Sequence, residues 1–380
     1  MNGKSMKKKL LLIAALFSFS LLACAQRLVV GTVSELQRHD AYTPSFKRDG
    51  SSRRIDNVIL MIGDGMGLSH VNAALFANGG ALTMTNLRVS GLVRTQSGSS
   101  FITDSGASAT AYATGTSTHN NAIGVDMQNH PLKNMTEVAS SHGYATGVLT
   151  TDLMSGATPS AFFAHQKDRK NTRGLWNDLA GSHLNFFSGG SRETLDSIPV
   201  EISGRIRAAF EVVHTRGAYP RSGKLGYLPP QAECGSIDNP ARKDFLPATT
   251  RYAMDYLDAV SKKGFFLMVE GARIDKTSHK NDFPATVKEV LDFDQAVEAA
   301  IRFAEADGHT LVIITADHET GAMSVPAGNP AKQQVTGAFA SVGHSPVTVP
   351  LFAYGPGSCW FSGVHTNAQI GRKLMEILSK

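Results

Sequence analysis

The chain has 380 residues, of which 42% are hydrophobic and 18% are charged, and its formal net charge is +5 at pH 7. This length is enough for a large hydrophobic core, and no low-complexity linker divides the central part, so we expect one large domain. Four lysines near the amino terminus supply most of the positive charge; without them the balance is 5 − 4 = +1, which does not support a basic surface for nucleic acid as a specific ligand.

The first 25 residues have the three-part pattern of a signal peptide for export. Lysines at positions 4, 7, 8 and 9 precede the apolar run 10–22, and three small residues follow at 23–25. The apolar run is too short to span a membrane comfortably, so we expect export, cleavage and a periplasmic protein. Residues 21–24 also resemble a bacterial lipobox. Lipid attachment at Cys24, giving an outer-membrane lipoprotein, is therefore an equal alternative, and membrane contact is expected only in that case.

Residues 26–56 are mostly polar and are expected to form an extended N-terminal arm ahead of a single domain at 57–380. Cys234 and Cys359 lie far apart in sequence, so a disulfide and two free thiols are equally expected. Neither belongs to a C-x-x-C pair, which argues against metal binding by sulfur.

Apolar strand patterns alternate with helical patterns from residue 57 onward. Strands are expected at 57–64, around 92–93, and at 145–150, 184–187, 264–270, 310–317 and 347–354; helices are expected after Gly67, from Ser105, ending near 142–143, at 248–260, over 287–304 and from Asn367. The region 188–243 is irregular, and we expect it to form excursions above the sheet edge. This alternation predicts an α/β fold: a doubly wound, mostly parallel central sheet with helices on both faces.

Three of the apolar runs end in a carboxylate, at Asp64, Glu270 and Asp317. Buried strands of a parallel sheet point one way, so their carboxyl ends share the rim at which α/β proteins bind ligands. Carboxylates crowded at a dry rim repel one another and need cations between them. A cluster of divalent metal ions is the simplest solution.

Further residues of metal-binding type lie close to these strands. Asp275 and His279 are four residues apart and would face the same way in a helical turn, His318 directly follows Asp317, and His344 follows a glycine. An adjacent Asp-His pair and a lone histidine are weak indications, because such residues are often structural. Oxygen and imidazole ligands without sulfur suit zinc, and an all-oxygen site suits magnesium.

Ser105 stands at the head of a run of small residues, 106–111. A helix beginning here would direct its free amides and its positive dipole end at an anion, and the small side chains would let the backbone approach a ligand. Ser105 is therefore a candidate nucleophile, although a helix N-cap serine is the commoner explanation of such a segment by itself.

Five motifs together resemble those of the alkaline phosphatases, in the order of that family and from about residue 57 to the carboxyl terminus. They are I-G-D-G-M-G at 62–67, T-D-S-G-A-S-A-T-A at 103–111, A-T-P at 157–159, V-E-G-A-R-I-D-K at 269–276 and T-A-D-H at 315–318. The resemblance implies an exported bacterial hydrolase for phosphate monoesters. It also implies two Zn²⁺ ions, one Mg²⁺ ion and a phosphoserine intermediate at Ser105.

The resemblance also assigns the ligands and the residues that contact substrate. It implies that Asp275, His279 and His344 bind the first zinc, that Asp64, Asp317 and His318 bind the second, and that Asp64, Thr158 and Glu270 bind the magnesium. Arg169 would grip the phosphate, because its fork matches two phosphate oxygens; without the resemblance it would be taken for a surface arginine. Lys276 would reach the phosphate through water.

Two departures from the family pattern are visible. Gly156 stands two residues before Thr158, where relatives often carry an Asp or His beside the magnesium, so the occupancy of the third metal site is in question. Only a short loop is expected between His318 and His344, where many relatives insert a crown over the dimer interface. A homodimer formed by that route is in question too.

The expected activity is that of a phosphomonoesterase of broad specificity, because the implied contacts converge on the phosphoryl group. The alternatives on the same fold are a phosphodiesterase, a sulfatase or a phosphomutase. From another class, an exported protein that binds metal or phosphate without turnover remains an alternative.

Overall fold

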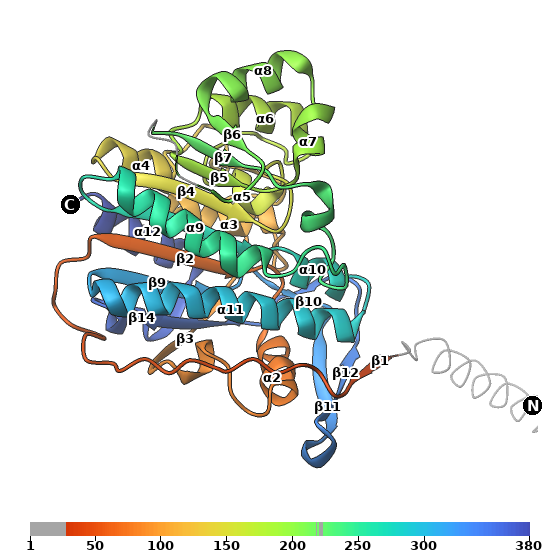
Figure 1. The fold of residues 1–380 in the computed structure, drawn as a ribbon. Coiled ribbons are helices and arrows are strands. Elements are labelled where there is room, and N and C mark those ends of the chain that lie inside the picture. Colours follow the sequence, from red (N-terminus) through yellow and green to blue (C-terminus); the bar gives the residue numbers. More distant parts are fainter. Residues whose placement is uncertain (1–27, 218, 220–222) are drawn as a thin grey trace, which may run out of the picture.

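A large twisted sheet forms the centre of the molecule (Figure 1). The computed structural model describes residues 28–217, 219 and 223–380, so the predicted signal peptide and lipobox lie outside the described residues. Within these residues the large sheet has ten strands in the order β15-β3-β14-β9-β2-β8-β4-β5-β7-β6.

The sheet is mostly parallel, as the sequence predicts. Within it, β14 alone runs antiparallel to its neighbours, which are β3 and β9. All residues of β2, β8 and β9 are buried, which explains why their sequences are continuous apolar runs. The strands of the large sheet are β2 (Asn57–Gly63), β3 (Val89–Arg94), β4 (Ala145–Thr150), β5 (Phe186–Ser188), β6 (Glu211–Val213), β7 (Leu225–Tyr227), β8 (Phe265–Gly271), β9 (Thr310–Thr315), β14 (Val349–Tyr354) and β15 (Gly363–Thr366).

Helices cover both faces of this sheet. On one face, α9 packs on β4 and β8 while α11 packs on β9 and β2; on the other, α3, α4 and α12 pack together (Figure 1). The fold is therefore the doubly wound α/β arrangement that the sequence predicts. The helices are α2 (Leu68–Ala77), α3 (Ser105–Thr114), α4 (Met135–Ser141), α5 (Ala157–Ser160), α6 (Thr172–Gly181), α7 (Arg192–Ser197), α8 (Val200–Ala209), α9 (Phe245–Val260), α10 (Arg273–Ser278), α11 (Phe283–Asp307) and α12 (Asn367–Leu378), with single 3₁₀ turns at η1 (Met84–Asn86), η2 (Gln231–Cys234), η3 (Pro330–Lys332) and η4 (Ser358–Phe361).

The three strands with terminal carboxylates are neighbours in the order β9-β2-β8. Ile62 of β2 lies opposite Glu270 of β8 on one side and opposite Thr315 of β9 on the other. Because all three strands are parallel, the residues that follow them emerge at the same rim.

The N-terminal arm differs from the expectation in one respect, because it carries a strand. β1 (Val29–Val33) pairs with β12 (Gln334–Phe339), which also pairs with β11 (Met323–Asn329), and together they form a small separate sheet. The segment between His318 and His344 is therefore a hairpin rather than a simple loop. Its ends are tied by the short pair of β10 (Glu319–Thr320) and β13 (His344–Ser345).

The region 188–243 also differs from the expectation. Instead of forming only excursions above the sheet edge, it supplies β7 and β6, which extend the large sheet beyond β5. Each of these strands has only three residues. Runs this short contain too few alternations to reveal a strand from sequence.

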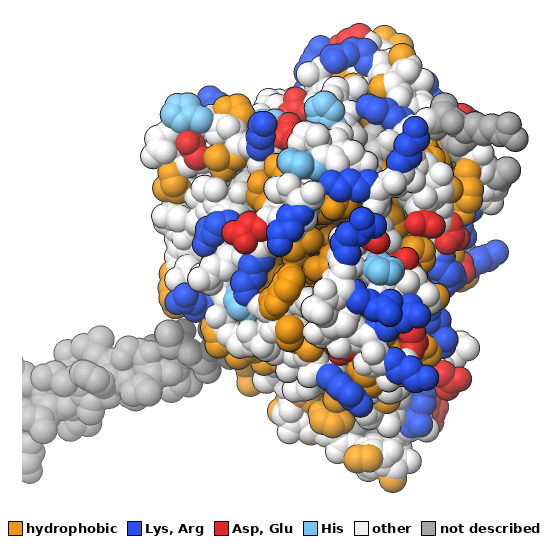
Figure 2. All heavy atoms as spheres, turned by 90° about the vertical axis from the view of Figure 1, so that its left-hand side faces the viewer, with side chains coloured by type: hydrophobic (Ala, Val, Ile, Leu, Met, Phe, Trp, Pro, Cys, Tyr) orange, Lys and Arg blue, Asp and Glu red, His pale blue; other side chains and the backbone are white. Residues whose placement is uncertain are grey.

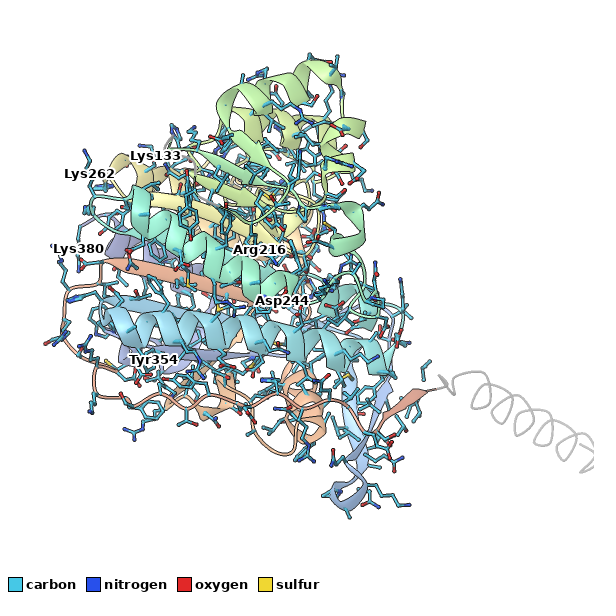
Figure 3. The ribbon with its side chains drawn as sticks, viewed as in Figure 1. Lys133, Arg216, Asp244, Lys262, Tyr354 and Lys380 are labelled. Atoms are coloured by element: carbon cyan, nitrogen blue, oxygen red, sulfur yellow. The ribbon has the colours of Figure 1, made fainter. Side chains whose placement is uncertain are left out.

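Basic residues gather on the side of the molecule away from α10. Lys133, Lys262 and Lys380 lie on this side in Figure 3, and Figure 2 shows Lys and Arg side chains around apolar ones on the same face. A cavity of about 320 Å³ there is lined by residues that include Tyr144 and Trp360. Since α10 lies on the far side in that view, these positive charges do not adjoin the rim that carries the carboxylates.

Two remaining expectations concern membranes and thiols. Among the helices of the described residues, none combines the length and the apolar composition needed to cross a membrane. Cys234 and Cys359 are both free thiols, so the disulfide alternative is not found.

Candidate active site

The strand-end carboxylates lie together, buried, at one rim of the sheet. Asp64 directly follows β2, Glu270 is the penultimate residue of β8, and Asp317 lies two residues beyond β9. None of the three is more than 7% exposed. Charges of one sign are therefore concentrated where little water can screen them.

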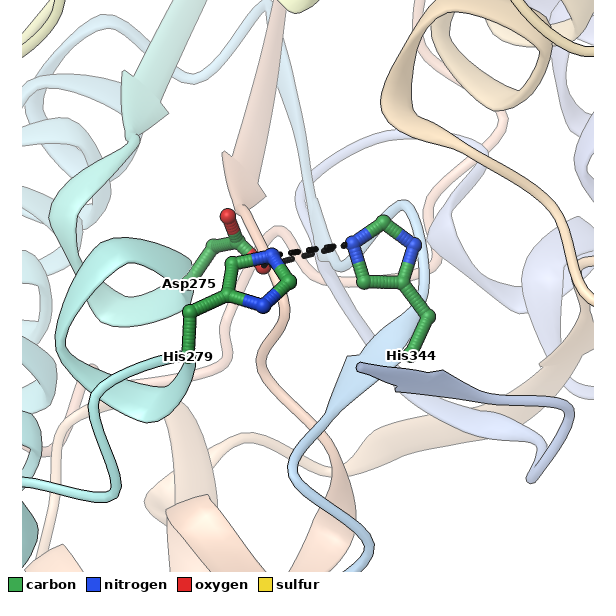
Figure 4. Close-up of side chains that lie close together, drawn as sticks. All are labelled: Asp275, His279 and His344. Carbon is green, nitrogen blue, oxygen red and sulfur yellow. Dashed lines mark hydrogen bonds and ion pairs between the residues drawn. The ribbon is translucent and has the colours of Figure 1, made fainter. Parts of the chain in front are cut away.

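A first group of ligand atoms is formed by Asp275, His279 and His344 (Figure 4). Helix α10 places Asp275 and His279 one turn apart, and β13 brings His344 to face them. The Nε2 atoms of His279 and His344 lie 3.2 and 3.6 Å from Oδ1 of Asp275 and 3.3 Å from each other.

The far ring nitrogens of these two histidines are held by the backbone. Nδ1 of His344 donates to the carbonyl oxygen of Thr103 at 2.9 Å, and Nδ1 of His279 donates to the carbonyl oxygen of Val342. A neutral imidazole that donates through Nδ1 has its Nε2 lone pair free, and metal-binding histidines are commonly oriented in this way.

A second group is formed around His318. Its Nε2 atom lies 3.2 Å from Oδ2 of Asp317 and 3.5 Å from Oδ1 of Asp64. Ligand atoms of Asp64, Asp275 and His318 also lie within 4.8 Å of one another. The residues expected at a second zinc site are thus together, and Asp275 lies between the two groups.

Ser105 is the first residue of α3 and faces the second group. The N-cap is Asp104, whose side chain accepts a hydrogen bond from the backbone N–H of Ala107 at 3.0 Å, so Ser105 is not itself the cap. The Oγ atom of Ser105 lies 3.1 Å from Nε2 of His318. Ser108 fixes the helix at this position, because its hydroxyl donates to the carbonyl oxygen of Asp317 at 2.7 Å.

Arg169 lies at the same end of α3. Its Nη1 atom donates to Oδ2 of Asp104 at 2.9 Å, while Oδ1 of Asp104 caps the helix. The guanidinium side chain is 33% exposed, so part of its donor fork can still meet a ligand. One carboxylate therefore positions both the helix that carries Ser105 and the arginine beside it.

The residues expected at the magnesium site, the third group, offer oxygen atoms only. Thr158 lies in α5, and its Oγ1 is buried without a hydrogen-bond partner among the described residues. Glu270 accepts a hydrogen bond from the hydroxyl of Thr150. Lys276, which follows Asp275 in α10, forms an ion pair with Asp152.

Burial and mutual repulsion disfavour negative charge on most of these carboxylates. Burial raises the pKa of Asp64 well above its ordinary value, and the neighbouring Asp317 and Asp275 raise that pKa further. Burial likewise raises the pKa of Asp317 to about 7 and the pKa of Glu270 to about 8. The positive charge near the cluster is therefore too small to keep all of these carboxylates ionised.

The histidines respond in two ways. Burial lowers the pKa of His318 well below its ordinary value, which keeps the ring neutral and able to donate a lone pair. Burial acts to raise the pKa of Asp275, but the hydrogen bond from His279, the charges of His318 and His279 and the hydrogen bond from Thr320 together outweigh it, so the pKa of Asp275 is lowered. The hydrogen bond to Asp275 raises the pKa of His279 to about 9. The His279 ring therefore carries a positive charge when no metal ion is bound.

Divalent metal ions fit these residues. Three buried oxygen atoms, Oδ1 of Asp64, Oδ2 of Asp317 and Oγ1 of Thr158, have no hydrogen-bond partner among the described residues. An unpartnered buried polar atom costs free energy, which a bound cation would offset. The first two groups combine nitrogen and oxygen donors, as zinc prefers, and the third offers oxygen only, as magnesium prefers.

Sequence reasoning missed three residues that support the site. Asp104 holds Arg169, Thr150 donates to Glu270, and Asp152 pairs with Lys276. Asp104 belongs to the motif at 103–111 and directly precedes Ser105. The other two lie at and just beyond the end of β4, where the parallel-sheet rule could have directed attention to them.

Comparison with known proteins agrees with this geometry. A family model described as alkaline phosphatase matches residues 55–183 and 235–340. Alkaline phosphatase 4 of Bacillus subtilis (strain 168) is 36% identical over 343 residues, which cover 85% of this chain and 72% of that protein. The solved alkaline phosphatase of the Antarctic bacterium TAB5 is 33% identical with a TM-score of 0.80, over 86% of this chain and 99% of that one. A His-to-Asp variant of the TAB5 enzyme, solved with Mg bound in its M3 site, is 32% identical with the same TM-score and coverage. The chain is therefore a phosphatase that belongs to the alkaline phosphatase family.

Proposed function

We propose that this phosphatase is a metal-dependent phosphate monoester hydrolase of broad specificity, which acts through a phosphoserine at Ser105. The observation that carries the proposal is the position of Ser105. Its hydroxyl lies at the amino end of α3, 3.1 Å from Nε2 of His318. Beside it are buried carboxylates whose negative charge is not balanced by nearby cations.

Two Zn²⁺ ions and one Mg²⁺ ion suit the three groups of donor atoms. Asp275, His279 and His344 would hold the first zinc; Asp64, Asp317 and His318 would hold the second; Asp64, Thr158 and Glu270 would hold the magnesium. The magnesium assignment is supported by the Mg in the M3 site of the solved TAB5 variant. When bound, such ions supply positive charge that lowers the pKa of a hydroxyl group and stabilises a departing oxygen.

The proposed reaction has two displacements at phosphorus. In the first, Oγ of Ser105 loses its proton and forms a bond to phosphorus while the bond from phosphorus to the substrate oxygen breaks, and that oxygen takes up a proton and leaves as the alcohol. In the second, water attacks the phosphoserine from the opposite side, inorganic phosphate leaves and the serine hydroxyl is restored. Arg169 and the free amides of α3 would hold the nonreacting phosphate oxygens, whose charge changes in the transition state.

Broad specificity follows from the location of these contacts. Every residue assigned above acts on the phosphoryl group or on a metal ion, and none is assigned to the alcohol. Binding energy is therefore concentrated on the part that all monoesters share, so different alcohols should be hydrolysed with similar kcat/KM.

The test is p-nitrophenol release from three of its esters, the phosphate monoester, the phosphate diester and the sulfate ester, by protein loaded with Zn²⁺ and Mg²⁺. We expect the monoester to be hydrolysed fastest, and chelation to abolish the reaction. Faster turnover of the diester or the sulfate ester would mean that phosphate diesters or sulfate esters, and not monoesters, are the substrates. A folded, metal-loaded protein that binds phosphate but hydrolyses none of the three would contradict the proposal.

A further inference from the structure

We propose that Asp152 is a positioning residue for the third metal group and supplies, from another place in the chain, the carboxylate that is absent at Gly156. The inference rests on the proposed function, because Thr158 and Glu270 are metal ligands only under that proposal. It concerns two residues, Asp152 and Lys276, neither of which is assigned as a metal ligand.

Gly156 is not required by its backbone conformation. Its φ and ψ are −60° and 155°, which any residue can adopt. A Cβ atom at this position would lie 3.0 Å from Oδ2 of Asp152 and 3.0 Å from the carbonyl oxygen of Leu153, closer than most such contacts. The space that a side chain at position 156 would need is therefore occupied in part by the carboxylate of Asp152.

The carboxylate that fills this space is paired with a residue of the site. Oδ1 of Asp152 accepts a hydrogen bond from Nζ of Lys276, and Lys276 directly follows Asp275, which belongs to both histidine-containing groups. The side chains of Asp152 and Lys276 are 24% and 41% exposed, so neither has been withdrawn into the core. Asp152 thus holds the lysine in place beside the candidate active site.

The main chain of Asp152 is linked to Glu270 as well. Its N–H donates to Oγ1 of Thr150 at 2.9 Å, and the hydroxyl of Thr150 donates to Oε2 of Glu270. The carbonyl oxygen of Asp152 accepts from the N–H of Gly190 at 2.7 Å, which fixes the turn after β4. The side chain of Asp152 therefore orients Lys276, and its main chain supports the threonine that holds Glu270. Loss of such outer partners typically costs about 10- to 100-fold in metal affinity or activity.

The experiment measures how Mg²⁺ alone stabilises the zinc-loaded full-length protein. For each variant, the melting temperature is followed as Mg²⁺ is added, and bound zinc is measured by mass spectrometry. Asp152→Asn keeps the size of the side chain and removes its charge. We expect the Mg²⁺ concentration for half-maximal stabilisation to rise about 10- to 100-fold while zinc content is unchanged.

A second pair of variants tests the exchange with Gly156. Asp152→Ala should raise the Mg²⁺ midpoint as Asp152→Asn does. Adding Gly156→Asp to Asp152→Ala moves a carboxylate to position 156 and removes one of the two close contacts there, so we expect the midpoint to return to within a few-fold of the original protein. Gly156→Asp alone places a second carboxylate against Asp152, so its effect should not add to that of Asp152→Ala.

The matched control is Asp238→Asn, which breaks a surface ion pair with Lys288 whose Nζ lies 2.6 Å from Oδ1 of Asp238. It should leave the Mg²⁺ midpoint unchanged. An unchanged midpoint in Asp152→Asn, or a double variant no better than Asp152→Ala, overturns the inference. If the original protein hydrolyses no monoester, the proposed function fails separately, because the Mg²⁺ titration needs no substrate.

Discussion

Oγ of Ser105 lies 3.1 Å from Nε2 of His318, although the two residues are 213 positions apart in sequence. If Ser105 is the nucleophile, Ser105→Ala removes the atom that bonds to phosphorus. We expect kcat for p-nitrophenyl phosphate to fall by about 10³-fold or more, as it does when other enzymes lose a nucleophile. Because none of the donor groups includes Ser105, zinc content should be nearly unchanged.

Two measurements complete this test. Acid quenching during turnover followed by mass spectrometry should find phosphate on residue 105 of the original protein and none on the variant. Ser141→Ala, at an exposed helix end, is the control and should retain full activity. Loss of zinc from Ser105→Ala would mean that the serine has a ligand role instead.

Arg169 is predicted to matter through the shape of its guanidinium group. Nη1 of Arg169 donates to Oδ2 of Asp104 at 2.9 Å, and this hydrogen bond fixes the orientation of the guanidinium group. Arg169→Lys keeps the charge and loses the two-point contact with phosphate, so we expect kcat/KM to fall by about 10- to 100-fold and the inhibition constant of inorganic phosphate to rise. Arg173→Lys, whose exposed side chain pairs with Glu201, should change neither quantity. Equal inhibition constants of inorganic phosphate in the two variants would mean that Arg169 does not contact the substrate.

The central strands and their carboxylates could be predicted because the relevant sequence pattern is local. A fully buried parallel strand is a continuous apolar run, and the residues at its end emerge at the rim of the sheet. The sequence alone therefore places Asp64, Glu270 and Asp317 at one rim. The helical spacing of Asp275 and His279 is equally local, and α10 confirms it.

Other features could not be predicted because they depend on partners remote in sequence. β14 is an apolar run like its neighbour β9, and nothing in its own pattern gives its antiparallel direction. β1 is a strand only because β12, from the opposite end of the chain, lies beside it and places Val335 opposite Val33. Asp152 belongs to no motif, and its proposed role depends on a lysine in α10.

Removal of the metal ions should make stability depend on pH in a particular direction. Without a cation, the folded-state pKa values of Asp317 and Glu270 are raised to about 7 and about 8, above those of the unfolded chain. The folded state then binds more protons than the unfolded state, so stability falls as pH rises towards these values. His279 acts in the same direction, because its pKa is raised to about 9 and its favourable charge is lost as pH rises through that value.

We therefore expect the melting temperature of chelated protein to fall between about pH 6.5 and pH 9, the range between the ordinary histidine pKa and the raised one. The metal-loaded protein should change less, because ligand protons compete less with metal as pH rises. The measurement is calorimetry of both forms in one buffer series, with readdition of Zn²⁺ and Mg²⁺ as the control for reversibility. A melting temperature of the chelated form that rises over this range would contradict the proposed charge balance.

A buried ion cluster outside the site gives a prediction about stability alone. Arg242 is 2% exposed, and its guanidinium donates to Glu289 at 2.7 Å and to Asp292 at 2.5 Å, both on α11. Arg242→Met leaves two buried carboxylates without their partner, which typically costs about 3–5 kcal/mol. We expect a fall of several degrees in melting temperature, measured on metal-loaded protein so that the candidate active site does not contribute.

Two comparisons decide whether the lost charge is the cause. Arg302→Met breaks an exposed pair with Glu298 on the same helix and should cost no more than about 0.5 kcal/mol. Adding Glu289→Gln and Asp292→Asn to Arg242→Met removes the unpaired charges and should recover much of the lost stability, since the penalty comes from buried carboxylates and not from the missing side chain. If the triple variant is less stable than Arg242→Met, packing of the arginine stem contributes more to stability than its charge does, and the charge argument is wrong for this cluster.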